Sequence, residues 1–328
     1  MGKKRDVSFK YYYGIPHAHT AFSTGRGTPL EAYEYAKKNN LNFLAITDHN
    51  SYLAKNYYVK DKNMSKWNTT KAMSEKFKKK NDILIPLVGF ETKTSPYGDL
   101  NIINSNTFFT GTVNNIKLLI IWMINNPDAF VTINHPHKEI TLLDYSEVLN
   151  KIITSIEVGN GSFPNKYIRH DKYYYTLLDK GWKLGAINGQ DNHRLNFGDS
   201  ENLTAIIAPS LSLNNIIDAF RRRRTYSTES RTLRLNFKIN NTYMGAILPS
   251  DSTKLNFSIF AEDPLVKINE IHIVTNKGNI VKKISDIHLN YIKYLYSHER
   301  KENETWYIIK VFQDNHRIAI SSPIFIEK

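Results

Sequence analysis

The segment HAHTAFSTGRGTPLEAYEYAKKNNLNFLAITDHNS, residues 17–51, decides the fold of this chain. It begins with His17 and His19, which follow a short apolar run, and it ends just after Asp48 and His49, which follow another. Side chains at positions i and i+2 of a strand point to the same face, so His17 and His19 can bind one ion together. Two strands that each end in histidine predict a metal site at one mouth of a parallel sheet.

The residues between those histidines predict a helix and a second strand. Thr28 can cap the helix, Pro29 suits its first turn, and Glu31 completes a capping box. The apolar run Leu41–Thr47 then predicts a strand. The segment is therefore a strand–helix–strand unit.

The same alternation of strand and helix continues to about residue 228. The expected strands are Tyr11–Ile15, Leu41–Thr47, Ile83–Phe90, Phe130–Asn134, Thr154–Val158, Leu184–Asn188 and Leu203–Ala208. The later helices are expected at Ser65–Lys80, Ile116–Asn125, Lys166–Lys180 and Leu213–Arg223. Strands separated by helices of ten or more residues imply a parallel sheet, and six or seven such units suit a barrel. We predict an α/β barrel domain over residues 8–230.

The pattern changes after Ser230. Stretches such as Lys254–Ala261, Thr305–Phe312 and Ile318–Ile326 alternate between apolar and polar residues, and turn residues such as Asn240-Asn241 separate them. Helical periodicity is nearly absent. We predict a smaller all-β accessory domain over residues 231–328, built as an antiparallel β-sandwich.

The composition is that of an ordinary globular protein, with 41% hydrophobic and 23% charged residues among 328. Lys and Arg number 44 against 31 Asp and Glu, a net charge of +13 that favours anionic partners. A small-molecule phosphate ester is the first candidate, and a nucleotide or nucleic acid is the second. No basic stripe interleaved with aromatic residues singles out nucleic acid.

The chain contains no cysteine, which excludes thiolate zinc sites, disulfides and a cysteine nucleophile. Met1–Asp6 is basic, but no apolar region of a signal peptide follows it. No run approaches the roughly 20 apolar residues that a membrane span needs. We expect a cytoplasmic protein without a membrane span, although a removed leader would leave the same sequence.

Further histidines and carboxylates close the later strands. Glu91 ends the third expected strand, His135 follows the fourth, and Asp191 and His193 follow the sixth. Active sites of parallel barrels lie at these strand ends. Imidazole and carboxylate ligands without sulfur suit Zn²⁺, Mn²⁺ or Fe²⁺. The number of ligands predicts two or three ions, and such a cluster lowers the pKa of a bound water for hydrolysis of a phosphate ester.

The segment 17–51 resembles the opening of the polymerase-and-histidinol-phosphatase (PHP) family of metal-dependent phosphoesterases. The later segments GFET, NHPH, IEVGNG and GQDNH follow in the order of that family. The stretch FGDSENLTAIIAPSLSLNNIIDAFRRRRTYST also resembles the end of the PHP subgroup that includes bacterial carbamate hydrolases. The likeness covers about residues 10–230 and implies a distorted (β/α)7 TIM-like barrel with up to three metals at its mouth.

The resemblance also implies which residues bind the ions. His17, His19, Glu91 and Asp191 would hold one ion, Glu91 and His135 a second, and His49 and His193 a third. Two positions depart from the family pattern. Thr24 stands where the family usually has an aspartate for the third ion, which weakens that site. Asp99 stands where the family often has a histidine for the second ion, which favours Mn²⁺ or Fe²⁺.

Other residues are candidates for substrate contacts or for positioning. Arg224 either donates to a substrate phosphate or caps the end of a helix. His137 either donates a proton to a leaving group or is an exposed loop histidine. Glu157 either orients a ligating histidine or pairs with a lysine. With the metal site, Asp48, His49 and His193 complete the expected catalytic set.

Three functions remain open from the sequence. The first is a hydrolase of a phosphomonoester or phosphodiester that uses a metal-bound hydroxide. The second is hydrolysis of a carbamate or carboxylic ester at the same metal site, because the cluster polarises a carbonyl equally well. The third is a degenerate barrel that binds a metal or an anion without turnover. The substrate and the oligomeric state do not follow from the sequence.

Overall fold

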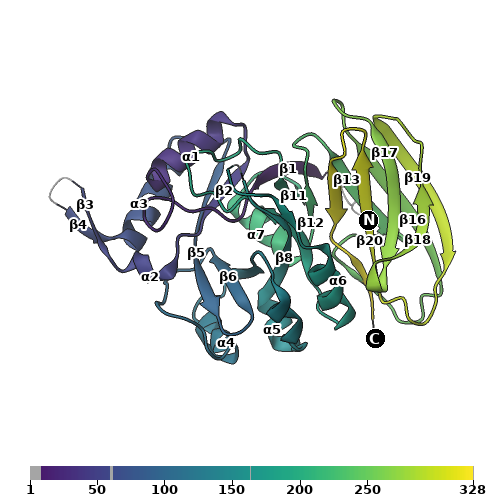
Figure 1. Cartoon of the computed structure of the whole chain (residues 1–328), viewed down its shortest axis with the longest axis horizontal. Helices are drawn as coiled ribbons and strands as arrows, with labels where there is room; N and C mark the ends of the chain where they lie inside the picture. Colours follow the sequence, from purple (N-terminus) through teal and green to yellow (C-terminus); the bar gives the residue numbers. More distant parts are fainter. Residues whose placement is uncertain (1–8, 60–61, 163, 328) are drawn as a thin grey trace, which may run out of the picture.

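The computed structural model describes residues 9–59, 62–162 and 164–327, so the expected start of the barrel at residue 8 lies just outside the described residues. The barrel strands are β1 (Lys10–Ile15), β2 (Phe43–Ile46), β5 (Ile85–Thr94), β6 (Gly98–Ile103), β7 (Phe130–Ile133), β8 (Ile153–Asn160), β10 (Gly185–Gly189), β11 (Leu203–Ala208) and β12 (Thr225–Thr228). They are ordered β10-β8-β7-β6-β5-β2-β1-β11-β12 (Figure 1). The terminal strand β10 also contacts β11 and β12, so the sheet curves back on itself.

The sheet is not uniformly parallel, which corrects the expectation from the sequence. β1, β2 and β5 pair in parallel, as do β7, β8 and β10. β6 is antiparallel to both β5 and β7, and β11 is antiparallel to both β1 and β12. The short connection Ser95–Tyr97 between β5 and β6 permits only an antiparallel pair. The sequence pattern missed β6 because no helix precedes it.

Helices cover the outside of the barrel and close its lower end. Their bounds are α1 (Pro29–Lys38), α2 (Asn50–Leu53), α3 (Lys66–Lys78), α4 (Lys117–Ile124), α5 (Glu147–Ile152), α6 (Asp171–Asp179) and α7 (Leu213–Arg221), with the 3-10 turn η1 (Lys138–Leu142). The capping box at Thr28 is confirmed, because Glu31 and Thr28 bond each other's backbone N–H groups. The helix expected at Lys166–Lys180 is shorter and follows a two-residue strand, β9 (Ile168–Arg169).

Helix α7 fills the bottom of the barrel. Phe220 stacks on Phe130 with ring centroids 4.6 Å apart, and it meets Phe43 edge-on at 6.1 Å. Phe43 and Phe130 begin β2 and β7, so this apolar core lies at the amino-terminal ends of the strands. The interior is closed there, which leaves the carboxyl ends of the strands as the open mouth.

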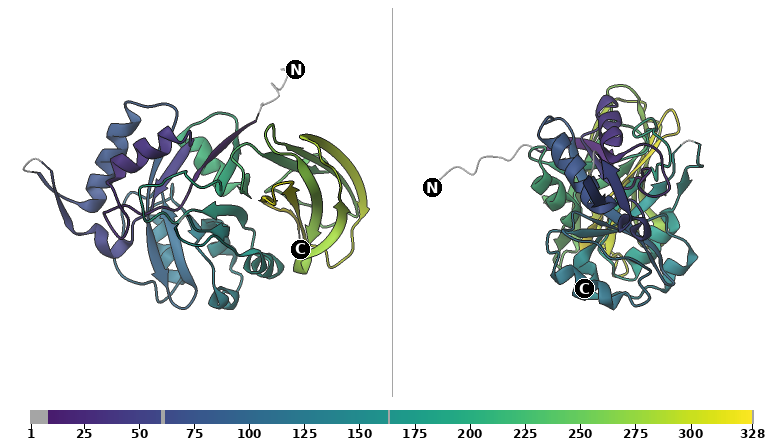
Figure 2. Two further views of the ribbon diagram at one scale, coloured as in Figure 1. Left: turned by 45° about the horizontal axis from the view of Figure 1, so that its top comes forward. Right: turned by 90° about the vertical axis from the view of Figure 1, so that its left-hand side faces the viewer.

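A β-hairpin of β3 (Asn56–Val59) and β4 (Lys62–Ser65) lies between α2 and α3. Figures 1 and 2 show it projecting from the barrel on the side away from the second unit. Its base adjoins the segment that follows His49, so the hairpin starts next to one of the expected metal ligands.

The second unit consists of antiparallel strands in two layers. Its strands are β13 (Arg234–Ile239), β14 (Thr242–Tyr243), β15 (Ile247–Leu248), β16 (Lys254–Glu262), β17 (Ile268–Thr275), β18 (Asn279–Ile284), β19 (Tyr291–Glu299), β20 (Trp306–Gln313), β21 (Ile318–Ser321) and β22 (Ile324–Ile326), with a short 3-10 turn at Asn276–Gly278. One layer has the order β14-β13-β16-β19 and the other β21-β20-β17-β18, and apolar side chains from both form a core. Among the described strands of this second unit, only the short β15–β22 pair is parallel.

The two units share a sheet and a packed interface. β21 pairs with β12, so the barrel sheet continues into the second unit across residue 230 (Figure 1). Trp306 stacks on Tyr175 of α6 at 5.7 Å, and its ring N–H donates to Asp179 at 2.9 Å. Such shared pairing and burial hold the second unit in a fixed orientation beside the barrel. No helix in the described part of the chain is long and apolar enough to cross a membrane.

Candidate metal centre

The expected ligands gather at the mouth of the barrel. His17 and His19 follow β1, His49 follows β2, and Glu91 lies in the upper part of β5. His135 follows β7, and Asp191 and His193 follow β10. Backbone contacts hold these strand ends together, because Ala18 bridges to Asn192 and His49 bridges to Glu91. Residues far apart in sequence therefore converge on one buried volume.

His17, His19 and Asp191 point at a common position. The two Nε2 atoms of His17 and His19 lie 3.2 Å apart, and Asp191 Oδ1 lies 3.3 and 3.1 Å from them. Asp191 Oδ1 is buried and makes no hydrogen bond within the described structure. A buried carboxylate oxygen without such a bond is costly unless a ligand satisfies it. The three atoms therefore form a donor set that fits a divalent ion.

Glu91 lies between that group and a second one. Its Oε1 is 3.3 Å from His17 Nε2 and 3.2 Å from His135 Nε2, while its Oε2 is 2.9 Å from His49 Nδ1. Each carboxylate oxygen thus faces a different set of imidazoles, which is the arrangement of a bridging ligand. Asp99 Oδ2 lies at 4.0 Å from His135 Nε2, at the edge of the second group.

A third group contains imidazoles alone. The ligand atoms of His19, His49 and His193 lie within 4.8 Å of one another, as do those of the groups His17–His19–Asp191 and His17–Glu91–His135. Thr24 is exposed and has no carboxylate to add. The third group is therefore the weakest of the three for a cation.

The electrostatics of the centre follow from this crowding of charges. Burial lowers the pKa of His17, but the carboxylates of Asp191, Glu157 and Glu91 outweigh it and raise the pKa well above the usual value. Burial also lowers the pKa of His19, but the adjacent carboxylates of Asp191 and Glu91 outweigh it and raise the pKa to about 9. Burial acts to raise the pKa of Glu91, yet His17 and His135 hold it well below its usual range. Without an ion, protons on the imidazoles balance the carboxylates.

An outer layer of residues orients the histidines. Glu157 is fully buried, and its Oε1 lies 2.9 Å from His17 Nδ1. Its Oε2 accepts the backbone N–H of His135 at 2.6 Å. This settles the open reading of Glu157 in favour of a partner for a candidate metal ligand rather than for a lysine.

The geometry places Asp48 in the same layer, and its expected catalytic role stays a prediction. Its buried carboxylate accepts the backbone N–H and the hydroxyl of Thr20 at 2.8 and 2.6 Å, and also the hydroxyl of Ser23. Ser23 Oγ in turn lies 3.3 Å from His19 Nδ1. Asp48 therefore reaches the centre through Ser23, and the sequence pattern did not single out Ser23.

Arg224 lies away from the candidate metal centre, and His137 is paired with a glutamate at the surface. Arg224 precedes β12, which runs in the same direction as β1, so it lies at the end of the barrel away from His17. Its guanidinium pairs with Asp218 and covers the ring of Phe9. His137 contacts Gly98, and its Nδ1 is 2.6 Å from Glu139 on the surface. The expectation for Arg224 is therefore wrong in position, and His137 is tied to an exposed glutamate.

Asn134 is a further residue of the centre that the sequence pattern did not identify. Its side-chain N–H donates to Glu91 Oε1 at 2.9 Å, and it is buried. Asn134 directly precedes His135, so its place in the segment NHPH was the only feature of the sequence that could have indicated this role.

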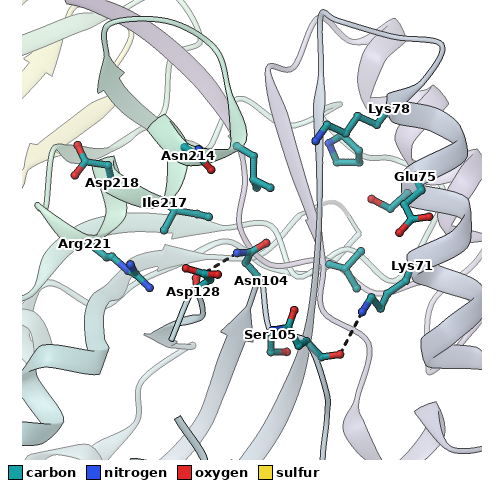
Figure 3. Close-up of a pocket in the computed structure, with 15 residues that line it drawn as sticks. Lys71, Glu75, Lys78, Asn104, Ser105, Asp128, Asn214, Ile217, Asp218 and Arg221 are labelled. Carbon is teal, nitrogen blue, oxygen red and sulfur yellow. Dashed lines mark hydrogen bonds between the residues drawn. The ribbon is translucent and has the colours of Figure 1, made fainter. Parts of the chain in front are cut away.

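A separate cavity lies near the lower end of the barrel. It has a volume of about 630 Å³ and opens between α3 and α7 (Figure 3). Lys71 and Glu75 of α3 face Asp218 and Arg221 of α7 across it (Figure 3). Pro86 and Val88 of β5 line it, whereas Glu91 lies further along the same strand at the mouth. This cavity is not part of the candidate metal centre.

Comparison with known families identifies the domain that contains this candidate centre. The model of the PHP domain matches residues 16–196, more than half of the chain. The chain belongs to the PHP domain family. No curated protein matches it. The match covers every residue of the three ligand groups.

Solved structures show a related fold. A two-domain protein from Bacteroides vulgatus ATCC 8482, described as containing a predicted PHP-like metal-dependent phosphoesterase, is 17% identical with a TM-score of 0.54. The alignment covers 95% of this chain and 94% of that one, so the likeness in fold extends over both units. PsfC from Pseudomonas syringae PB-5123 is 14% identical over 66% of this chain and 90% of its own, with a TM-score of 0.46.

Proposed function

We propose that this PHP protein is a metal-dependent hydrolase that cleaves a phosphomonoester or phosphodiester. The observation that carries the proposal is the convergence of His17 Nε2, His19 Nε2 and Asp191 Oδ1 within 3.1–3.3 Å, with the carboxylate oxygen buried and without a hydrogen bond inside the described residues. Family membership over residues 16–196 supports the same class of chemistry.

The residues divide into proposed ligand groups. His17, His19, Glu91 and Asp191 would hold the first ion, and Glu91, His135 and Asp99 the second. A bound divalent ion polarises a phosphoryl oxygen and makes water more acidic, which is the chemistry of phosphate ester hydrolysis. Donors without sulfur favour Zn²⁺, Mn²⁺ or Fe²⁺. We propose two firmly bound ions, because the third group offers imidazoles without a carboxylate of its own.

The protein's own residues prepare the site for that chemistry. Glu157 accepts the proton on His17 Nδ1, so the lone pair on Nε2 faces the centre. His49 and His193 are 28% and 35% exposed, so unlike His17 they can reach a substrate at the mouth. We propose that they either hold a third ion or donate hydrogen bonds to the substrate phosphate.

The proposal is tested with purified protein loaded with Mn²⁺. p-Nitrophenyl phosphate and bis-p-nitrophenyl phosphate test phosphoester hydrolysis, and naphthyl methylcarbamate tests the carbamate alternative. We expect phosphate ester turnover that His17→Ala abolishes. His288→Ala is the control, because His288 is an exposed histidine of the second unit paired with Asp314.

Each outcome separates the open functions. Turnover of the carbamate alone would favour the second function. No turnover of any substrate by fully loaded protein would overturn the hydrolase and leave a barrel that binds metal without catalysis.

A further inference from the structure

Two lysines lie side by side next to the candidate metal centre. The backbone N–H of Lys66 donates to the backbone carbonyl of Lys55 at 2.8 Å, which joins the start of α3 to the residue that precedes the hairpin. Both ammonium groups lie over the ring of Tyr52, Lys55 Nζ at 4.5 Å and Lys66 Nζ at 5.8 Å from its centroid. Two like charges therefore contact one aromatic ring.

This pair adjoins the mouth of the barrel. The ring of Tyr52 lies 6.5 Å from the ring of His49, centroid to centroid. Lys66 Nζ also donates to the carbonyl of Phe22 at 2.8 Å, in the loop that follows His19. The ring of Tyr52 therefore contacts both lysines and lies next to His49 of the third group of imidazoles, on the side where the hairpin projects.

No carboxylate of the described residues forms an ion pair with either lysine. Within the ranges that the structure describes, neither ammonium group lies within 4.0 Å of a carboxylate. Burial lowers the pKa of Lys66; Asp48 raises it in part, and the charge of Lys55 lowers it again. The carboxylate oxygens of Asp48 are already bonded to Thr20 and Ser23. Two adjacent cations without an acid between them repel each other, and an anionic ligand removes that repulsion.

We propose that Tyr52, Lys55 and Lys66 form a subsite that binds a second anionic group of the substrate, remote from the phosphate at the metal centre. The inference rests on the proposed function for the position of the reacting phosphate. It narrows the substrate class to small molecules that carry a phosphate ester and, a few bonds away, another phosphate or a carboxylate. An ammonium group contributes a charge-assisted hydrogen bond to either anion.

The test measures binding of phosphonates, whose C–P bond is not hydrolysed. Butylphosphonate carries one anionic group, butane-1,4-diylbisphosphonate carries two, and 5-phosphonopentanoate replaces the second with a carboxylate. Isothermal titration into Mn²⁺-loaded protein gives the Kd of each. We expect the two doubly anionic probes to bind at least about tenfold more tightly than butylphosphonate, as one charge-assisted contact is worth roughly that factor.

The variant Lys55→Met/Lys66→Met keeps the apolar stems and removes both charges. It should reduce the ratio between the Kd values of butylphosphonate and the bisphosphonate to about one. The control Lys254→Met/Lys293→Met removes the same net charge from exposed strands of the second unit and should keep the wild-type ratio.

The results separate the subsite from the proposed function. Equal affinity of wild-type protein for all probes overturns the subsite, and so does a ratio that the double variant does not change. Selectivity for the doubly anionic probes without hydrolysis of any ester keeps the subsite and overturns the phosphoesterase. Hydrolysis of simple phosphate esters without such selectivity keeps the phosphoesterase and overturns the subsite. A preference for the bisphosphonate over the phosphonocarboxylate identifies the second group as phosphate.

Discussion

Replacing Glu157 with glutamine tests whether the outer layer sets the affinity of the centre. Glu157 Oε2 accepts two N–H groups, from the His135 backbone at 2.6 Å and from the Asn160 side chain at 2.8 Å, while Oε1 faces His17 Nδ1 at 2.9 Å. The single carbonyl oxygen of glutamine fits best where two donors meet. Its NH₂ group then faces His17 Nδ1 and can only donate. The proton of His17 is forced onto Nε2, the atom that faces the ion position.

The magnitude follows from the contact that is lost. A hydrogen bond to a charged group is worth about 1.5–3 kcal/mol. Each 1.4 kcal/mol is about a factor of ten in affinity. Outer partners of metal ligands show the same range, with losses of about 10–100-fold on substitution. We expect the Kd of the first Mn²⁺ ion to rise about 10–100-fold in Glu157→Gln.

The assay is calorimetric titration of Mn²⁺ into metal-free protein. Glu270→Gln is the matched control, because Glu270 Oε2 also lies 2.8 Å from a histidine nitrogen, that of His272 in the second unit. The control should keep the wild-type Kd. An unchanged Kd in Glu157→Gln would refute the reasoning about the tautomer of His17, and an equal loss in both variants would show that the effect is not specific to the centre.

Three further outcomes are expected. Thr24→Asp should raise the number of bound ions per chain, measured by elemental analysis, because it supplies the carboxylate that the family usually has at this position; an unchanged number would contradict this account of the position. Removal of metal with a chelator should lower the free energy of unfolding in urea, by about 2.7 kcal/mol relative to protein in ion at a hundred times its Kd. Burial raises the pKa of Asp263, but hydrogen bonds from the backbone of Leu265 and from Ser230, Thr232 and Gln313 hold it below its usual range. A carboxylate whose pKa is lower in the folded than in the unfolded protein stabilises the fold above the unfolded pKa of about 3.9, and this stability is lost as the pH falls through the folded pKa. The free energy of unfolding of Asp263→Asn in urea should therefore depend less on pH between these two pKa values.

Sequence reasoning found the residues that gather at the mouth of the barrel because their signal is local. His17 and His19 share one face of a strand end, and a capping box fixes where the next helix starts. These features depend on spacings of two or three residues, which are visible without a structure. The strand ends then converge because parallel strands direct their carboxyl ends to the same side of a sheet.

The parts that sequence reasoning missed depend on contacts between distant segments. β6 has only a short connection to β5, so its antiparallel direction is set by pairing with β7 as well as by the turn. Arg224 precedes a strand, but the side of the barrel it occupies depends on the direction of β11. The role of Asp48 depends on Thr20 and Ser23, which sit in a loop without periodicity. Pairing partners of this kind are not encoded in spacing along the chain.

The candidate metal centre and the closure of the barrel depend on the same contacts. Glu157 contacts His17, 140 residues away in the sequence, and the backbone N–H of His135, 22 residues away. Both contacts exist only when β1, β7 and β8 are in place. The carboxylates of Glu91, Glu157 and Asp191 crowd into the same volume, and their repulsion opposes closure of the barrel. Protons held on His17 and His19 offset that repulsion in the metal-free protein. A divalent ion bound by these residues would supply positive charge in place of those protons, so we expect ion binding to stabilise the barrel. The residues proposed to bind the metal are therefore also the residues that hold the mouth of the barrel in shape.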